Sequence, residues 1–294
     1  MNSIREINFH GLKIGGEKVD GITDLSYKPI FVLELNIFDF SVSSHIVKDW
    51  YNRKLKTENG KPSREHLCIL AQETECDILA LKFNITENDL EENINEAKAL
   101  LKELLPHIKK PLLIRGANNK SIDIKLLPAL MEVLDREIII AFADENTYKE
   151  IVPRVVKGGH ILTIRTPIDI NLAKEMNILT SDMSLSFDKI LIDTDMGGLG
   201  YGLEYGYSIM ERIKLAAFEG DKMLNMPLIA FAGEEALKAK ETKSETFPKS
   251  FGDFKERSIM FEITTASAVI AAGANVIVLE HPDSIRVLKN LYPW

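Results

Sequence analysis

Eight short apolar runs, separated by stretches with helical periodicity, recur along this chain of 294 residues. Each run is rich in Ile, Val and Leu, as is typical of parallel strands that are covered on both faces. Between two of the runs, Leu90, Ile94 and Leu101 fall on one helical face. The alternation predicts an α/β fold, in which eight parallel strands close into a (β/α)8 TIM barrel. The predicted strands are 29–35, 77–83, 111–115, 137–142, 160–165, 189–193, 227–231 and 275–279.

The length of the chain fits one barrel better than two average domains, because such barrels take roughly 250 residues. The residues before the first strand are polar and rich in turn formers, and residues 12–16 suggest a hairpin that could plug one end of the barrel. We therefore predict an N-terminal segment, 1–28, that closes a single barrel domain at 29–294. Thr166 is the expected N-cap of the helix after the fifth strand, because Pro167 and Asp169 follow it.

The charge of the chain excludes some classes of partner. Its net charge of −8 argues against a nucleic-acid surface, which needs a basic stripe to displace counterions. The first residues lack the basic and apolar regions of a signal peptide, and no apolar run approaches the ~20 residues that span a bilayer. We expect a cytoplasmic protein without nucleic-acid or membrane partners.

Metal chemistry within this chain is not expected either. The two cysteines, Cys68 and Cys76, cannot supply the four sulfurs of an iron–sulfur site or a zinc ribbon. The six histidines are scattered along the chain without a metal-binding spacing.

Candidate site residues lie where the predicted strands end, because barrel sites form at the carboxyl ends of the strands. The sixth strand ends at Asp193 and runs into a glycine-rich loop, 197–202, where the backbone can approach a ligand closely. This loop has neither the lysine of a phosphate-binding loop nor dinucleotide-binding spacing. The predicted ligand- or partner-facing rim consists of Asn36, Lys82, Asp144, Asn146, Arg165, Asp193, Gly197, Gly198, Gly200 and Tyr201.

Three of these features have alternative interpretations. Lys82 could form a Schiff base, but a lysine at a strand end is more often paired with a rim acid such as Glu34. Asp193 could contact a ligand, or it could accept backbone N–H groups and shape the turn. The charged segment 238–257, which follows the seventh strand, is either a lid or docking loop or a solvated insertion.

Four blocks of the chain resemble one family. They are TPIDINLAK at 166–174, IDTDMGGLGYGLEY at 192–205, SIMERIK at 208–214 and GDKMLNMP at 220–227. They resemble the small (delta) subunit of the corrinoid iron–sulfur protein of the CO dehydrogenase/acetyl-CoA synthase system. The likeness runs in order from the first strand to the last helix.

The resemblance implies a TIM barrel, related to pterin-binding methyltransferases, that pairs with a large subunit. That subunit holds the corrinoid (cobalamin) and a [4Fe-4S] cluster, so this chain is expected to bind no cofactor by itself and to catalyse little alone. The pair would take a methyl group from a methyl-tetrahydropterin and deliver it to the acetyl-CoA synthase metal centre, with that enzyme and a pterin methyltransferase as further partners. The predicted rim would then face the corrinoid or the large subunit.

Two other functions are compatible with the same residues. The first is a stand-alone pterin methyltransferase, in which Asp193 and Asn146 would bind the pterin ring. The second is a barrel lyase that uses Lys82.

Overall fold

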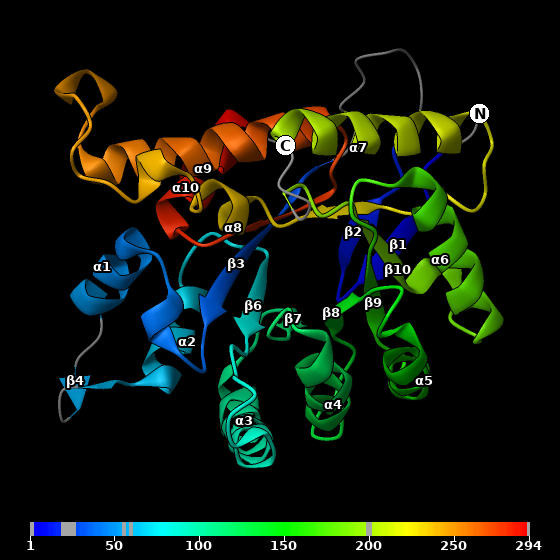
Figure 1. Cartoon of the computed structure of the whole chain (residues 1–294), viewed down its shortest axis with the longest axis horizontal. Coiled ribbons are helices and arrows are strands. Elements are labelled where there is room, and N and C mark those ends of the chain that lie inside the picture. Colours follow the sequence, from blue (N-terminus) through cyan, green and yellow to red (C-terminus); the bar gives the residue numbers. More distant parts are fainter. Residues whose placement is uncertain (1–2, 19–27, 55–56, 59–60, 198–201, 293–294) are drawn as a thin grey trace.

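Eight parallel strands form a closed barrel in the computed structural model, which describes residues 3–18, 28–54, 57–58, 61–197 and 202–292 (Figure 1). Strands that follow one another in the chain pair with one another, and the last pairs with the first. The predicted TIM barrel is therefore confirmed, and each predicted strand lies within two residues of an observed one. The strands are β3 Ile30–Asn36, β6 Ile78–Lys82, β7 Leu112–Arg115, β8 Ile139–Ala143, β9 Ile161–Arg165, β10 Ile190–Asp193, β11 Leu228–Ala230 and β12 Val276–Leu279.

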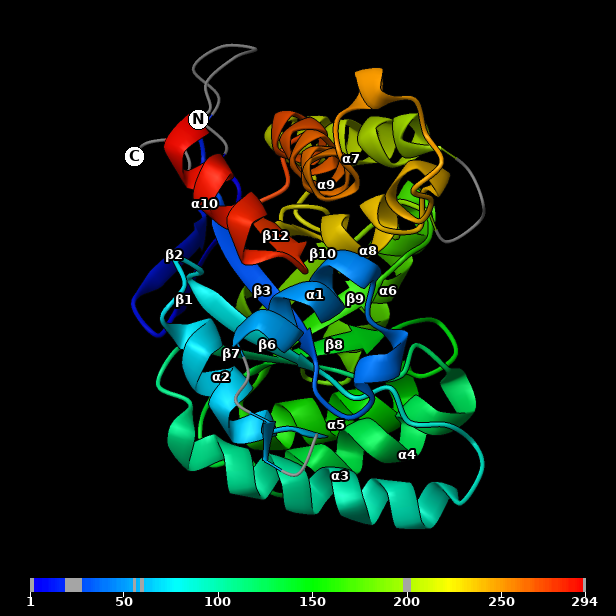
Figure 2. The ribbon, with the colours of Figure 1, turned by 90° about the vertical axis from the view of Figure 1, so that its left-hand side faces the viewer.

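Helices surround the strands, as Figure 2 shows with α2, α3, α6, α7 and α10 around the barrel. They are α1 His45–Lys54, α2 Arg64–Gln72, α3 Leu90–Leu104, α4 Lys120–Met131, α5 Tyr148–Gly158, α6 Ile170–Asp182, α7 Leu203–Phe218, α8 Ala232–Ala236, α9 Phe254–Ala271 and α10 Pro282–Leu291. Short 3₁₀ helices are η1 Phe40–Val42, η2 Leu105–His107, η3 Phe187–Lys189, η4 Lys240–Thr242 and η5 Lys249–Phe251. A small antiparallel pair, β4 Thr57–Glu58 and β5 Lys61–Pro62, separates α1 from α2. Among the described helices, none combines the length and the apolar composition that crossing a bilayer requires.

The strands alternate between two apolar clusters. In β3, Ile30 and Val32 belong to the cluster inside the barrel, whereas Phe31 and Leu33 pack in the layer between the barrel and the helices. Because side chains on a strand alternate with a period of two, Glu34 comes next on the inner side. The last inward side chain of each strand therefore reaches the carboxyl end of the barrel, which we call the mouth.

The opposite end is plugged by the predicted hairpin. Strands β1 Glu6–Phe9 and β2 Leu12–Gly15 pair antiparallel, and their side chains Ile7, Phe9 and Ile14 belong to the cluster inside the barrel. The boundary predicted at residue 28 stays a prediction, because residues 19–27 lie outside the described part of the chain.

The predicted start of α6 is wrong by three residues. Asp169, not Thr166, is the N-cap, and its carboxylate accepts hydrogen bonds from the N–H groups of Asn171 and Leu172. Thr166 instead donates its backbone N–H to the carbonyl of Asp193 at 2.9 Å. The chain thus keeps its contact with β10 past the end of β9, and the helix can begin only after it leaves that strand.

The segment 238–257 contains η4 and η5 and projects near one end of α9 (Figure 1). Arg257, the last residue of this segment, belongs to α9 and is buried. The Arg257 guanidinium donates hydrogen bonds to the carbonyls of Glu241, Ser244 and Gly252, at 2.7, 2.6 and 3.2 Å. One buried side chain therefore ties the segment to the helix, which a freely solvated insertion would lack.

Candidate functional site at the barrel mouth

The register of the barrel brings charged side chains together at the mouth. Lys82 at the end of β6 is the register partner of Arg115 at the end of β7. Arg165 at the end of β9 is the register partner of Asp193 at the end of β10. Each of these side chains takes the inward position of its strand, so the polar strand ends converge on the barrel interior.

One cluster of ion pairs links Arg115, Lys82, Glu34 and Glu234. Arg115 is fully buried, and its Nη1 donates to both carboxylate oxygens of Glu34 at 3.0 and 3.1 Å. Its Nη2 donates to Glu234. Lys82 Nζ lies 3.4 Å from Glu234 and 3.9 Å from Glu34. The expected pairing of Lys82 with Glu34 is therefore confirmed, and the two cations compensate the two carboxylates.

The surroundings of Glu234 and Arg115 favour the charged forms of these two side chains. Burial acts to raise the pKa of Glu234, but the charges of Arg115 and Lys82 outweigh it and hold that pKa far below its usual range. Burial likewise acts to lower the pKa of Arg115, and the carboxylates of Glu34 and Glu234 raise it instead. These buried charges are thus maintained by one another.

Aromatic rings and guanidinium groups fill the barrel axis at the mouth. The guanidinium carbon of Arg165 lies 3.4 Å from the ring centroid of Phe142, and that of Arg115 lies 4.4 Å from the centroid of Phe231. The two rings meet edge to face at 6.1 Å. This stack leaves the axis occupied by the chain's own side chains, held by cation–π contacts.

Asp193 is engaged within the protein. Its Oδ2 accepts a hydrogen bond from Arg165 Nε at 2.6 Å, and its Oδ1 accepts the backbone N–H of Asp195 at 2.9 Å. Arg165 Nη1 also lies 3.7 Å from Asp195, whose pKa is raised by burial. The interpretation of Asp193 as a residue that shapes the turn is confirmed.

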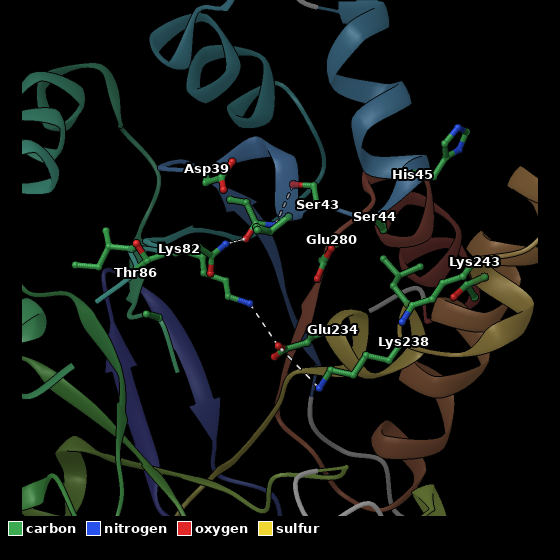
Figure 3. A pocket seen from close by; sticks show the side chains of 17 residues that line it. Asp39, Ser43, Ser44, His45, Lys82, Thr86, Glu234, Lys238, Lys243 and Glu280 are labelled. Atoms are coloured by element: carbon green, nitrogen blue, oxygen red, sulfur yellow. Dashed lines mark hydrogen bonds and ion pairs between the residues drawn. The ribbon is translucent and has the colours of Figure 1, made fainter. Parts of the chain in front are cut away.

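An open cavity of about 550 Å³ lies to one side of this filled axis, over β3, β6, α8 and the end of β12 (Figure 3). The predicted rim residues Asn36 and Lys82 line it, together with Asn84, Glu234 and Glu280. Asn36 Nδ2 donates to Ser43 Oγ at 3.0 Å, and Asn36 Oδ1 accepts a hydrogen bond from Asn84. The amides on this wall are therefore fixed in position.

Glu280 lies deep in the same cavity. It is 8% exposed, and within the described part of the chain its carboxyl group makes no hydrogen bond. Burial and, second, the charge of Glu34 raise the pKa of Glu280 to about 8. Its backbone N–H is held by Glu262, and a Cβ atom on Gly233 would lie 2.7 Å from that nitrogen. Burial and the charge of Glu34 thus favour the uncharged form of Glu280, whose backbone packs closely against α8.

The other predicted rim residues that the structure describes do not line this cavity. Asp144 Oδ1 accepts hydrogen bonds from Asn146 N and Thr147 Oγ1, in the turn between β8 and α5. Gly197 lies with Arg165 and Asp193 around a separate small hollow. Gly198, Gly200 and Tyr201 lie outside the described residues. That these residues face a corrinoid or a partner stays a prediction.

The predicted rim does not include Glu280, Phe142 or Phe231. For Glu280 a signal exists in the sequence, because it follows Val276 and Val278 at a period of two. Phe142 has no such signal, since the β8–β9 register shifts between Ala141 and Ala143.

The described residues contain no group of three His, Cys, Asp or Glu side chains arranged to hold a metal ion. Both cysteines, Cys68 and Cys76, are buried free thiols.

The fold is similar to that of solved dihydropteroate synthases. The enzyme from Xanthomonas albilineans with 4-aminobenzoic acid matches with a TM-score of 0.60 at 10% identity, over 99% of this chain and 100% of that one. The Yersinia pestis enzyme with a pterine–sulfa conjugate matches with a TM-score of 0.59 at 12% identity, over 98% and 97%. The chain therefore has the same barrel fold as these enzymes.

Sequence comparison gives the particular family. The model of the CO dehydrogenase/acetyl-CoA synthase delta subunit matches residues 38–291, so this chain belongs to that family and the predicted resemblance is confirmed. The acetyl-CoA decarbonylase/synthase complex subunit delta of Archaeoglobus fulgidus is 30% identical over 225 residues, which is 74% of this chain and 49% of that protein. Subunit delta 1 of Methanosarcina thermophila is 32% identical over 203 residues, 67% and 46%. The chain spans about half the length of the curated relatives it matches.

Proposed function

We propose that this chain is the small subunit of a corrinoid iron–sulfur protein and covers the corrinoid that a large subunit carries. The pair transfers a methyl group between a methyl-tetrahydropterin and the acetyl-CoA synthase metal centre. The family supports this role, as do relatives that are named as subunits of an acetyl-CoA decarbonylase/synthase complex.

The filled barrel axis is the observation that carries the proposal. The structural neighbours that bind pterins share this fold, but here the stack of Arg115, Arg165, Phe142 and Phe231 occupies the centre of the mouth. Asp193, the acid considered for a pterin ring, is held by Arg165 and by the backbone of Asp195. A covering surface fits this mouth better than a stand-alone pterin site does.

The residues of the mouth fit the edge of a corrinoid, which carries neutral amide groups. Asn36 and Asn84 offer fixed amides, and Glu280 offers a carboxyl group that lacks a partner within the described chain. The bound cobalt would supply the nucleophile that accepts the methyl group. The two cysteines are too few for the cluster, which supports placing both cofactors on the large subunit.

The chain's own contribution would be to exclude water. A partner surface pressed over the mouth removes solvent from a reactive group, and a rigid network of ion pairs keeps the covering face from rearranging. The barrel therefore acts by shielding and positioning rather than by supplying a base or a nucleophile.

Purification from the native cells tests this function. A tagged chain should co-purify with a second polypeptide that carries cobalt and iron. Val42→Glu places a charge on the exposed wall of the cavity, and we expect it to weaken the association about tenfold or more, because an interface would bury that charge unpaired. Val42 is 56% exposed. Leu291→Glu, at a position 59% exposed at the end of α10, is the matched control and should leave the association unchanged.

Three results would contradict the proposal. The first is a chain that is coloured by a cobalt cofactor of its own. The second is rapid methyl transfer from methyl-tetrahydrofolate by the isolated chain, which would favour the stand-alone methyltransferase. The third is a covalent adduct at Lys82 after borohydride treatment with a carbonyl substrate, which would favour the lyase.

A further inference from the structure

Glu280 differs from the other acids at the mouth. Glu34 is held by Arg115, Glu234 by Arg115 and Lys82, and Asp193 by Arg165. Glu280 as a residue is 8% exposed, lines the cavity, and makes no side-chain hydrogen bond or ion pair within the described residues. The carboxyl group therefore faces the cavity with its hydrogen-bonding capacity unused by the described chain, and a ligand in the cavity can supply the partner.

A second polar atom of the lining also lacks a hydrogen-bond partner among the described residues. This atom is Ser44 Oγ, which is buried. The same lining carries the fixed amide of Asn36, which donates to Ser43 Oγ. The cavity of about 550 Å³ is large enough for one ring system with its substituents.

The charges that face Glu280 come from four elements. Glu34 on β3, Glu234 on α8 and Glu262 on α9 disfavour its ionised form, whereas Lys82 on β6 favours it. Burial of Glu280 is the largest effect and also opposes ionisation. The carboxyl group consequently offers one O–H donor and one carbonyl acceptor side by side.

We propose that this cavity binds the edge of an uncharged ring through an amide or lactam group, with Glu280 donating one hydrogen bond to it and accepting another. A carboxylic acid and an amide form such a pair because each presents a donor beside an acceptor. The group belongs to the carboxamides of the corrinoid edge or to the lactam of a pterin. The inference rests on the proposed function for this choice of rings.

The affinity for the ligand should fall as the pH rises. The ligand binds the protonated acid, so its affinity is constant below the pKa of about 8 and falls about tenfold per pH unit above it. Glu280→Gln keeps a donor beside an acceptor and cannot ionise. This variant should therefore bind with an affinity that no longer changes with pH.

Calorimetric titration of the full chain tests the inference, with cyanocobalamin and 5-methyltetrahydrofolate as separate probes. We expect the wild type to bind one probe about thirtyfold more weakly at about pH 9.5 than at about pH 6.5. Glu280→Gln should bind within about threefold of the wild type at the lower pH and show no change at the higher. Glu280→Ala should lose about tenfold or more at the lower pH. Glu219→Gln, exposed beyond the end of α7, is the matched control and should behave as the wild type.

The outcomes separate cleanly. Binding of cyanocobalamin alone assigns the amide to the corrinoid, and binding of 5-methyltetrahydrofolate alone assigns the lactam to a pterin. No saturable binding of either probe overturns the inference, as does a pH dependence that survives in Glu280→Gln. Circular dichroism checks that each variant is folded. If the Glu280 variants bind both probes as the wild type does, this inference fails. If the same variants still co-purify with a cobalt-bearing partner, the proposed function stands.

Discussion

Buried charges at the mouth are organised so that every ionised side chain has a counter-charge on another element. The pair of Arg115 and Glu34 is the most deeply buried, at 0% and 1% exposure of the side chains. Removing one partner from such a pair leaves an uncompensated charge away from water, which costs far more than the net stabilisation that the pair provides.

Arg115→Met should therefore lower the free energy of unfolding by about 3–5 kcal/mol, because it strands the carboxylate of Glu34. The double variant Arg115→Met with Glu34→Gln should recover a large part of that loss. Urea unfolding followed by circular dichroism measures both. Equal destabilisation in the single and double variants would show that the lost aromatic contact, and not the charge, is decisive.

How far the site could be predicted depends on how each side chain is positioned. Asn36, Lys82, Arg165 and Asp193 end strands with regular alternation, so strand ends were sufficient to find them. Whether each of these side chains forms an ion pair or lines the open cavity depends on which strands are neighbours in space. That information is absent from a list of strand ends, and the prediction therefore grouped residues that the fold separates.

At the scale of elements, the segment between β11 and α9 is anchored by a single cation. Arg257 is 5% exposed and reaches three carbonyl groups, while its guanidinium also lies 5.0 Å from the ring of Phe247. A lysine cannot replace these contacts, because its compact ammonium group cannot reach three separate carbonyl groups as the planar guanidinium does.

Arg257→Lys should release this segment without unfolding the barrel. We expect faster amide hydrogen exchange over 241–252, by about tenfold or more, with little change in β3 or β12, because local opening follows the loss of local hydrogen bonds. Hydrogen exchange read by mass spectrometry measures the effect. Arg286→Lys is the control, since Arg286 makes an exposed ion pair with Asp283. Unchanged exchange in Arg257→Lys would mean that the aromatic contacts hold the segment by themselves.

The strands could be predicted because their burial requires apolar residues, which are visible in the sequence. The strands are covered on both faces, and their apolar runs follow from that position in the fold. The start of α6 was not predictable in this way. Thr166 and Asp169 are both good caps, and only the contact of Thr166 with β10 decides between them.

At the scale of the whole molecule, the N-terminal hairpin completes the barrel core. Phe9 is fully buried in the interior cluster. A second link ties the same segment to the barrel, because Glu17 accepts hydrogen bonds from Lys214 of α7 and from Asn275 before β12. The hairpin is therefore part of the cooperative unit rather than an appended arm.

Phe9→Ala should destabilise the entire barrel, by about 3–5 kcal/mol, because it leaves a cavity at the plugged end. The melting temperature from calorimetry measures the loss. Leu215→Ala, at a position 59% exposed on α7, controls for the removal of apolar surface and should change it little. A loss confined to the hairpin, with the barrel transition unmoved, would show that the two fold independently.

The hairpin at the amino-terminal end of the barrel affects how solvent and small molecules reach the interior. Among the described residues, Ile7, Phe9 and Ile14 fill this end of the interior, so access to the interior is expected from the side where the strands finish. A single lid placed there would be enough to isolate whatever lies beneath it.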